Sequence, residues 1–246
     1  MDYDAYYTEV NLSVSGFINQ RVEEILMGFS GYRQTNRLLE IGFGAGALLR
    51  AANRAGWSAE GVEISKTAAE HVREEGLTVF CGDLLEAGYP EGHFDVVVAT
   101  ELLEHVDDPE SLVREVVRIL RPGGLFWATT PHVGGVSSRL LGLDWTTVSA
   151  DHLHLFSKKG LTSLLKNAGF RRVRMKTQGV DPFELWQALL QPKKFANVDS
   201  VKCITTRCGF NEALTRSLPR RLFKNFVNSL LRLSRLGDSL KIWAER

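Results

Sequence analysis

Cysteine is scarce in this 246-residue chain, which contains only Cys81, Cys203 and Cys208. Three unevenly spaced cysteines do not make a disulfide framework, and Cys203 with Cys208 are too few for a structural zinc site. Long apolar runs are also missing, since none approaches the ~18 residues that a membrane-spanning helix needs. The opening M-D-Y-D-A-Y-Y is acidic and aromatic, unlike the basic start of a secretory signal. These absences predict a cytoplasmic protein.

An excess of charge of one sign is absent as well, because the formal net charge is only +1. This balance conceals a basic segment, residues 192–235, which holds ten Lys and Arg but two acidic residues. The rest of the chain is therefore acidic, and it carries no recognised RNA-binding motif, so nucleic acid is not a favoured partner. The hydrophobic content of 44% is sufficient for a sizeable core.

The most informative stretch that is present reads L-E-I-G-F-G-A-G, residues 39–46. An apolar strand runs directly into Gly42, Gly44 and Gly46, and such a turn lets backbone N–H groups approach a ligand at the start of a helix. The pattern indicates a nucleotide-like cofactor. It also satisfies the dinucleotide pattern G-x-G-x-x-G/A, with Glu63 near the position of a ribose-binding acid. An NAD enzyme is therefore an alternative at this point.

Predicted strands and helices alternate through the first half of the chain. The strands are expected at 37–41, 57–63, 77–81, 94–100 and 125–130, and the helices at 12–29, 45–55, 66–75 and 109–120. This order predicts a doubly wound α/β fold. After Pro131 come a loop-rich stretch over 132–156, a helix over 157–168 that Gly169 stops, and a strand over 170–177. The last strand, 239–246, is expected to pair antiparallel with it, after an insertion of about fifty residues.

Four marks in this order resemble the class I S-adenosylmethionine-dependent methyltransferases, over about residues 30–180 and 238–246. They are Glu40 in E-I-G-F-G-A-G, Glu63 in G-V-E-I-S, Asp83 in C-G-D-L-L, and F-D-V-V-V-A-T-E-L-L-E-H-V followed by R-I-L-R-P-G-G. The resemblance implies a mostly parallel seven-stranded sheet with an antiparallel terminal strand pair. It divides the chain into an N-terminal helical cap (1–30), the cofactor domain (31–182 and 238–246) and a helical basic insertion (183–237).

The resemblance also implies a cofactor site for S-adenosylmethionine. The glycine turn is expected at the methionine part, Glu63 at the ribose hydroxyls and Asp83 at the adenine amino group. Glu40 is expected either to organise the glycine loop or to meet the cofactor ammonium group, and Glu63 and Asp83 could instead be helix caps. The full expected set is Tyr7, Glu40, Gly42, Gly44, Gly46, Glu63, Ile64, Asp83, Leu84, Thr100 and Glu101. Tyr6 and Tyr7 would either fold over the cofactor or pack the first helix.

Candidate groups for methyl transfer gather in two places. E-L-L-E-H brings Glu101, Glu104 and His105 to one face of a helical turn, and D-H-L-H-L-F carries His152 and His154. One hypothesis is that His105, His152 or His154 deprotonates the acceptor. Another is that Glu101, Glu104, His105 and a later histidine hold a divalent cation, since E-x-x-E-H resembles the metal-binding helix of small-RNA 2′-O-methyltransferases and ubiquinone-pathway O-methyltransferases. The third is a structural role for His105.

The acceptor is expected to be small. The stretch from W-T-T-V-S-A-D-H-L-H-L-F to N-A-G-F resembles a branch linked to sugars, cell-surface polysaccharides, lipids and secondary metabolites, which favours O-methylation of a small metabolite, sugar or lipid. N- or C-methylation, or a non-catalytic cofactor-binding scaffold, are the alternatives. A predicted amphipathic helix at 218–236 is expected either to cover the body or to contact an anionic membrane surface.

Overall fold

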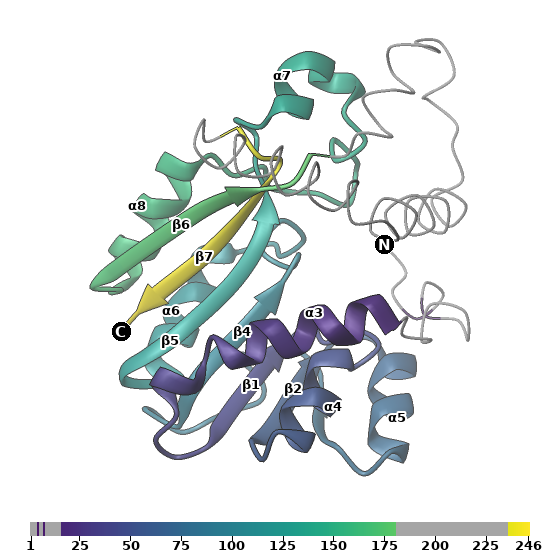
Figure 1. The fold of residues 1–246 in the computed structure, drawn as a ribbon, viewed down its shortest axis with the longest axis vertical. Helices are drawn as coiled ribbons and strands as arrows, with labels where there is room; N and C mark the ends of the chain where they lie inside the picture. Colours follow the sequence, from purple (N-terminus) through teal and green to yellow (C-terminus); the bar gives the residue numbers. More distant parts are fainter. Residues whose placement is uncertain (1–3, 5–6, 8–15, 181–235) are drawn as a thin grey trace, which may run out of the picture.

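The computed structural model describes residues 16–180 and 236–246, together with Asp4 and Tyr7 (Figure 1). The predicted basic insertion, 183–237, and its amphipathic helix, 218–236, fall almost wholly outside these residues. Within the described ranges, no helix combines the length and the apolar content that crossing a membrane requires.

A seven-stranded sheet forms the centre of the fold, with the strand order β3-β2-β1-β4-β5-β7-β6. The strands are β1 (Arg37–Ile41), β2 (Ser58–Glu63), β3 (Thr78–Cys81), β4 (Phe94–Thr100), β5 (Leu120–Pro131), β6 (Arg172–Gln178) and β7 (Ser239–Glu245). The first five strands are parallel to one another, while β7 lies antiparallel between β5 and β6. The predicted α/β class, the seven strands and the antiparallel terminal pair are confirmed.

Helices cover both faces of the sheet (Figure 1). On one face α3 (Gly16–Met27), α4 (Ala47–Arg54) and α5 (Lys66–Glu74) share a buried apolar cluster with strand residues such as Leu38 and Trp127. On the other face α6 (Pro109–Ile119) and α8 (Lys158–Ala168) pack against Leu39, Val97 and Phe126. The central strand β4 is buried on both faces, which explains its apolar run V-V-V-A over residues 96–99.

Side-chain caps define where three of these helices begin. Ser65 accepts a hydrogen bond from Ala68 N at the start of α5. Asp108, which directly precedes Pro109, accepts hydrogen bonds from the backbone amides of Glu110 and Ser111 at the start of α6. Ser157 caps α8 by accepting from Gly160 N, and Gly169, at φ +118°, ends that helix as predicted. The chain between β5 and α8 contains a short helix, α7 (Val136–Leu141), and a 3-10 helix (Gly142–Asp144).

The predicted start of the fifth strand at 125, after R-P-G-G, is wrong. The preceding helix does end before these residues, at Ile119, but β5 already starts at Leu120 and includes them, with Gly123 at φ +75°. A register irregularity in the β4–β5 pairing accommodates them, since Phe94 pairs with Leu120 and Val96 already pairs with Leu125. These residues belong to the strand because Arg121 is anchored beside β4: its Nε donates a hydrogen bond to the buried carboxylate of Asp95 over 2.6 Å.

Asp95 connects three segments at the amino end of the sheet. Besides Arg121, the backbone amides of Gln34 and Thr35 donate to its carboxylate, at 2.8 and 2.7 Å. Burial alone would raise the pKa of Asp95, but these hydrogen bonds outweigh burial and hold the pKa below its ordinary value. The side chain is completely buried.

Replacing Asp95 with Ala is expected to lower the free energy of unfolding by about 3–5 kcal/mol, because it leaves a half-buried guanidinium and two amides without their acceptor. Urea denaturation measures this loss. The control is Glu91→Ala, which removes the exposed partner of Arg246 and should cost under about 1 kcal/mol. Equal losses in the two variants would contradict the anchoring role of Asp95.

Candidate active site

The glycine loop leaves the carboxyl end of β1 with three residues in the left-handed region. Gly42, Gly44 and Gly46 have φ values of +67°, +51° and +70°, a conformation that other L residues adopt only with strain. The loop is also closely packed, because a Cβ atom at Gly42 would lie 2.9 Å from the Leu102 side chain and one at Gly44 would lie 2.8 Å from the Tyr7 hydroxyl. Both space and backbone conformation therefore require glycine.

Glu63, at the end of β2, connects this loop to the second strand. Its carboxylate accepts from Gly44 N at 3.0 Å and from Ser65 N at 3.1 Å, and the side chain is buried. Each oxygen can accept further hydrogen bonds. The structure therefore places Glu63 at the glycine loop as a loop-organising residue, and its predicted contact with ribose hydroxyls stays a prediction.

Glu40 lies buried beside the loop, on β1. Leu49 N in α4 donates to its carboxyl group, and its Oε2 atom has no partner among the described residues. Removal from water, together with the nearby negative charge of Glu63, raises the pKa of Glu40 to about 8. The contact with Leu49 supports the predicted loop-organising role, while Oε2 leaves one acceptor available to a cation.

The predicted adenine-binding residues follow β2 and β3. Asp83 is exposed, and its carboxylate accepts from Leu85 N at 2.8 Å, whereas Leu84 is buried in the core. Two apolar side chains near the acids in the sequence are exposed: Ile64, next to Glu63, is 55% accessible, and Leu85, two residues after Asp83, is 53% accessible. A carboxylate next to exposed apolar side chains is a suitable surface for a flat, hydrogen-bonding ring system.

The N-terminal segment reaches the same edge of the sheet. The Tyr7 hydroxyl lies against Gly44, and Asp4 accepts from the Ser65 hydroxyl at 2.8 Å and from Thr67 N at 3.1 Å. The sequence indicated Tyr7 as a cofactor residue but did not indicate Asp4. No local pattern marks Asp4, because its partners lie about sixty residues away in the chain.

A pair of glutamates follows β4. Glu101 has φ +47°, and its backbone N–H donates to both the carbonyl and the hydroxyl of Thr129, at 3.0 and 3.2 Å. Glu104 is only 1% exposed, and its Oε2 accepts from the Thr130 hydroxyl at 2.9 Å. The second oxygen, Oε1, has no partner among the described residues. No sequence motif indicated these threonines, which reach the glutamates only across the sheet.

The carboxyl groups of this pair retain protons at unusually high pH. Burial, together with the smaller effect of the charge of Glu101, raises the pKa of Glu104 to about 8. Although part of Glu101 is exposed, desolvation of its carboxyl group by surrounding protein raises its pKa as well. The charge of each carboxyl group therefore bears on the ionisation of the other.

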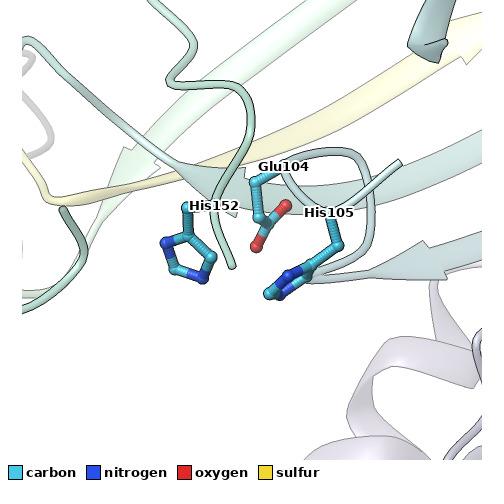
Figure 2. Close-up of side chains that lie close together, drawn as sticks. All are labelled: Glu104, His105 and His152. Atoms are coloured by element: carbon cyan, nitrogen blue, oxygen red, sulfur yellow. The ribbon is translucent and has the colours of Figure 1, made fainter. Parts of the chain in front are cut away.

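Two histidines complete this cluster (Figure 2). His105 Nδ1 donates to the Asp151 carbonyl at 2.9 Å, and His152 Nδ1 donates to the Thr147 carbonyl at 2.6 Å. Because a carbonyl only accepts, each neutral ring keeps its Nε2 lone pair available. The ring centroids are 4.6 Å apart, and one ligand atom each from Glu104, His105 and His152 lies within 4.8 Å of the others. Burial lowers the pKa of His105, which favours its neutral form.

The remaining predicted residues lie nearby but outside this group. His154 approaches the Asp107 carbonyl through Nε2 at 3.3 Å, and its backbone N–H donates to the Glu104 carbonyl at 3.1 Å. Thr100 is the last residue of β4, paired with Thr129. The sequence-predicted set therefore divides into a cofactor side around the glycine loop and a polar cluster after β4. The two sides adjoin, since Leu102 contacts the Gly42 position.

Comparison with known proteins identifies the family. A family model described as a methyltransferase domain matches residues 15–174, more than half of the chain. The chain belongs to the class I S-adenosylmethionine-dependent methyltransferase family. This membership confirms the resemblance seen in the sequence and decides for S-adenosylmethionine over NAD. A solved S-adenosylmethionine-dependent methyltransferase from Archaeoglobus fulgidus shares the fold, with a TM-score of 0.64, 19% identity and coverage of 100% of both chains.

Curated relatives of this methyltransferase include two proteins named ubiquinone biosynthesis O-methyltransferase. The one from Methylococcus capsulatus is 40% identical over 102 residues, which cover 38% of this chain and 43% of the relative. The one from Escherichia coli is 28% identical over 157 residues, which cover 59% of this chain and 63% of the relative. The chain thus spans less than two thirds of the length of either relative.

Stability of the cofactor-free methyltransferase is expected to fall as the pH rises from 4.5 to 8. Between these values folded Glu40 keeps a proton that the unfolded chain has released, so this residue contributes a slope of up to about 1.4 kcal/mol per pH unit. Glu40→Gln should remove the share of this slope that Glu40 contributes when urea denaturation is compared at pH 5.5 and 8, while Glu104, whose pKa is also raised to about 8, keeps its own share. Glu70→Gln, on the exposed face of α5, is the control. A slope that is unchanged in Glu40→Gln would contradict the assignment.

Proposed function

We propose that this protein transfers a methyl group from S-adenosylmethionine to a hydroxyl oxygen of a small-molecule acceptor. The observation that carries the proposal is the cluster of Glu104, His105 and His152 beside the glycine loop, at the carboxyl edge of the sheet. Ligands of open α/β sheets bind at this edge. The names of the curated relatives support oxygen as the methyl acceptor and a ubiquinone precursor as the acceptor class.

On the cofactor side, the roles inferred from sequence are retained as proposals. The glycine loop would receive the methionine part, and Glu63 would accept from the ribose hydroxyls. Asp83 and the Leu84 amide would bind the adenine ring, with the exposed side chain of Ile64 against its face. The contact of Tyr7 with the glycine loop supports its place over the cofactor. The N-terminal segment would then serve as a cap on the cofactor domain.

On the acceptor side, methyl transfer to a hydroxyl benefits from removal of its proton in an aligned, enclosed site. His105 and His152 each retain a free Nε2 in the neutral form, so either could accept this proton. The buried carboxyl pair beside them provides further acceptors. The cluster therefore supports deprotonation of an acceptor bound between it and the glycine loop.

The same side chains fit a divalent cation. One carboxylate oxygen of Glu104 and one ring nitrogen each of His105 and His152 lie within 4.8 Å of one another. Glu104 Oε1 has no partner among the described residues, and backbone carbonyls orient the two imidazole rings through Nδ1. Such an ion would act as a Lewis acid that lowers the pKa of the acceptor hydroxyl. We propose Glu104, His105 and His152 as its ligands, with Glu101 adjacent. A metal-free histidine base is the alternative that the experiments must separate.

Isothermal titration is expected to show binding of S-adenosylmethionine and S-adenosylhomocysteine, and no binding of NAD. Asp83→Ala should weaken the affinity by about tenfold or more, because one charged acceptor for the adenine amino group is lost. Glu70→Ala, an exposed acid on α5, provides the matched control. Unchanged affinity in Asp83→Ala would remove Asp83 from the adenine site.

Turnover is measured with a panel of acceptors that carry aromatic, sugar or lipid hydroxyl groups. EDTA, Glu104→Gln and His152→Ala are each expected to reduce turnover by about 100-fold, since a cation and its ligands act together. Added Mg²⁺ or Mn²⁺ should restore the EDTA-treated enzyme but not the variants. His71→Ala, a surface histidine on α5, is the control.

Two other outcomes are informative. Turnover that resists EDTA but is lost in His152→Ala would support the metal-free base and contradict the cation. A greater loss in His154→Ala than in His152→Ala would show that the histidine beside Asp107, and not the one in the cluster, serves the acceptor.

A further inference from the structure

We propose that Thr129 and Thr130, at the carboxyl end of β5, are positioning residues that hold the two glutamates of the acceptor site. Neither threonine belongs to the sequence motifs, and neither carries a titratable group. The inference rests on the proposed function, because it assumes that Glu101 and Glu104 face the reaction.

Thr130 selects which oxygen of Glu104 is available. It is completely buried, and its hydroxyl donates to Glu104 Oε2 over 2.9 Å. The other oxygen, Oε1, has no partner among the described residues and is the one left for an acceptor hydroxyl or a cation. A glutamate side chain is long, and its terminal torsion is broadly distributed. One strong hydrogen bond to a buried hydroxyl therefore decides the orientation of the carboxyl plane.

Thr129 fixes the backbone from which the glutamates project. Its carbonyl and hydroxyl both accept from the backbone N–H of Glu101, which has φ +47°. Residues other than glycine rarely adopt this conformation, and it persists only where the surroundings hold it. The turn at Glu101 starts the E-L-L-E-H segment, so its direction determines where Glu104 and His105 lie.

Backbone pairing with both neighbouring strands holds these two threonines in place. Thr129 pairs with Thr100 at the end of β4, and on the other side Thr129 and Thr130 pair with Lys241 and Leu240 of β7. A site held by residues of a paired strand is more tightly positioned than one held by a loop alone. The antiparallel insertion of β7 beside β5 thus contributes to the acceptor site, although no residue of β7 is a candidate ligand or base.

A purely structural role would not require a hydroxyl at position 130. Valine has nearly the same shape, favours strands and would fill the same completely buried site. The choice between valine, serine and threonine therefore separates packing from positioning. Serine keeps the hydroxyl and loses the methyl group, whereas valine keeps the shape and loses the hydroxyl.

The experiment measures kcat, the KM of the acceptor and the Kd of S-adenosylmethionine for the wild type, Thr130→Val and Thr130→Ser, with thermal melting as a check of folding. Thr130→Val is expected to lower kcat by about 10- to 100-fold, since a hydrogen bond to a reacting-site carboxylate is lost. The Kd of S-adenosylmethionine should change by less than about twofold, because Glu104 is not part of the cofactor side. Thr130→Ser should recover most of the lost kcat. Thr162→Val, which removes a hydroxyl bonded to the Lys158 carbonyl in α8, should retain wild-type kcat.

Thr129→Val tests the second half of the inference. It removes one of the two acceptors of Glu101 N–H, so kcat is expected to fall by a smaller factor, about three- to tenfold. Unchanged kcat in Thr130→Val, or an equal loss in Thr130→Val and Thr130→Ser, would overturn the positioning role while leaving the proposed function intact. Absence of turnover in the wild type would overturn the proposed function, and this inference with it.

Discussion

Parallel pairing of β1 with both β2 and β4 is the constraint on which the rest of this molecule depends. It brings the carboxyl ends of three strands to one edge, and each strand delivers its polar residues there. Gly42 follows β1, Glu63 ends β2 and Glu101 follows β4, so residues that are far apart in the chain become neighbours. The apolar side chains that make this pairing stable, among them Leu39, Val62 and Val97, are buried on the faces of the sheet and take no part in the site.

The site concentrates acidic side chains where water is excluded. Glu40, Glu63 and Glu104 are all at most 5% exposed, and burial raises the pKa of Glu40 and Glu104 to about 8. Such groups are costly without a positive partner. S-adenosylmethionine carries a sulfonium and an ammonium group, and the proposed divalent ion carries two charges. An edge lined by buried carboxyl groups therefore lowers stability in the absence of a cation, and the proposed cationic ligands would offset that cost.

Much of the fold was predictable because its signals are local. Alternating apolar runs and helical periodicity located the first four strands, and Gly169 marked the end of the helix before β6. The strand at R-P-G-G was mispredicted because proline and two glycines normally break structure, and the contact that overrides them, Arg121 with Asp95, is made between residues 26 positions apart. The candidate site shows the same division. Glu40, Glu63, Asp83 and the E-L-L-E-H residues belong to recognisable motifs, whereas Asp4 and Thr130 have no such mark.

The sequence by itself determined the family, the cofactor and the succession of strands and helices along the chain, since these depend on short motifs and on the periodicity of apolar residues. Only the tertiary structure decided which polar groups meet. It placed His152, and not His154, with Glu104 and His105, and it turned Thr130 toward the carboxyl group of Glu104. The physical reason is that hydrogen-bond partners in a folded chain are chosen by distance and direction in space, and neither is encoded in the spacing of residues along the chain.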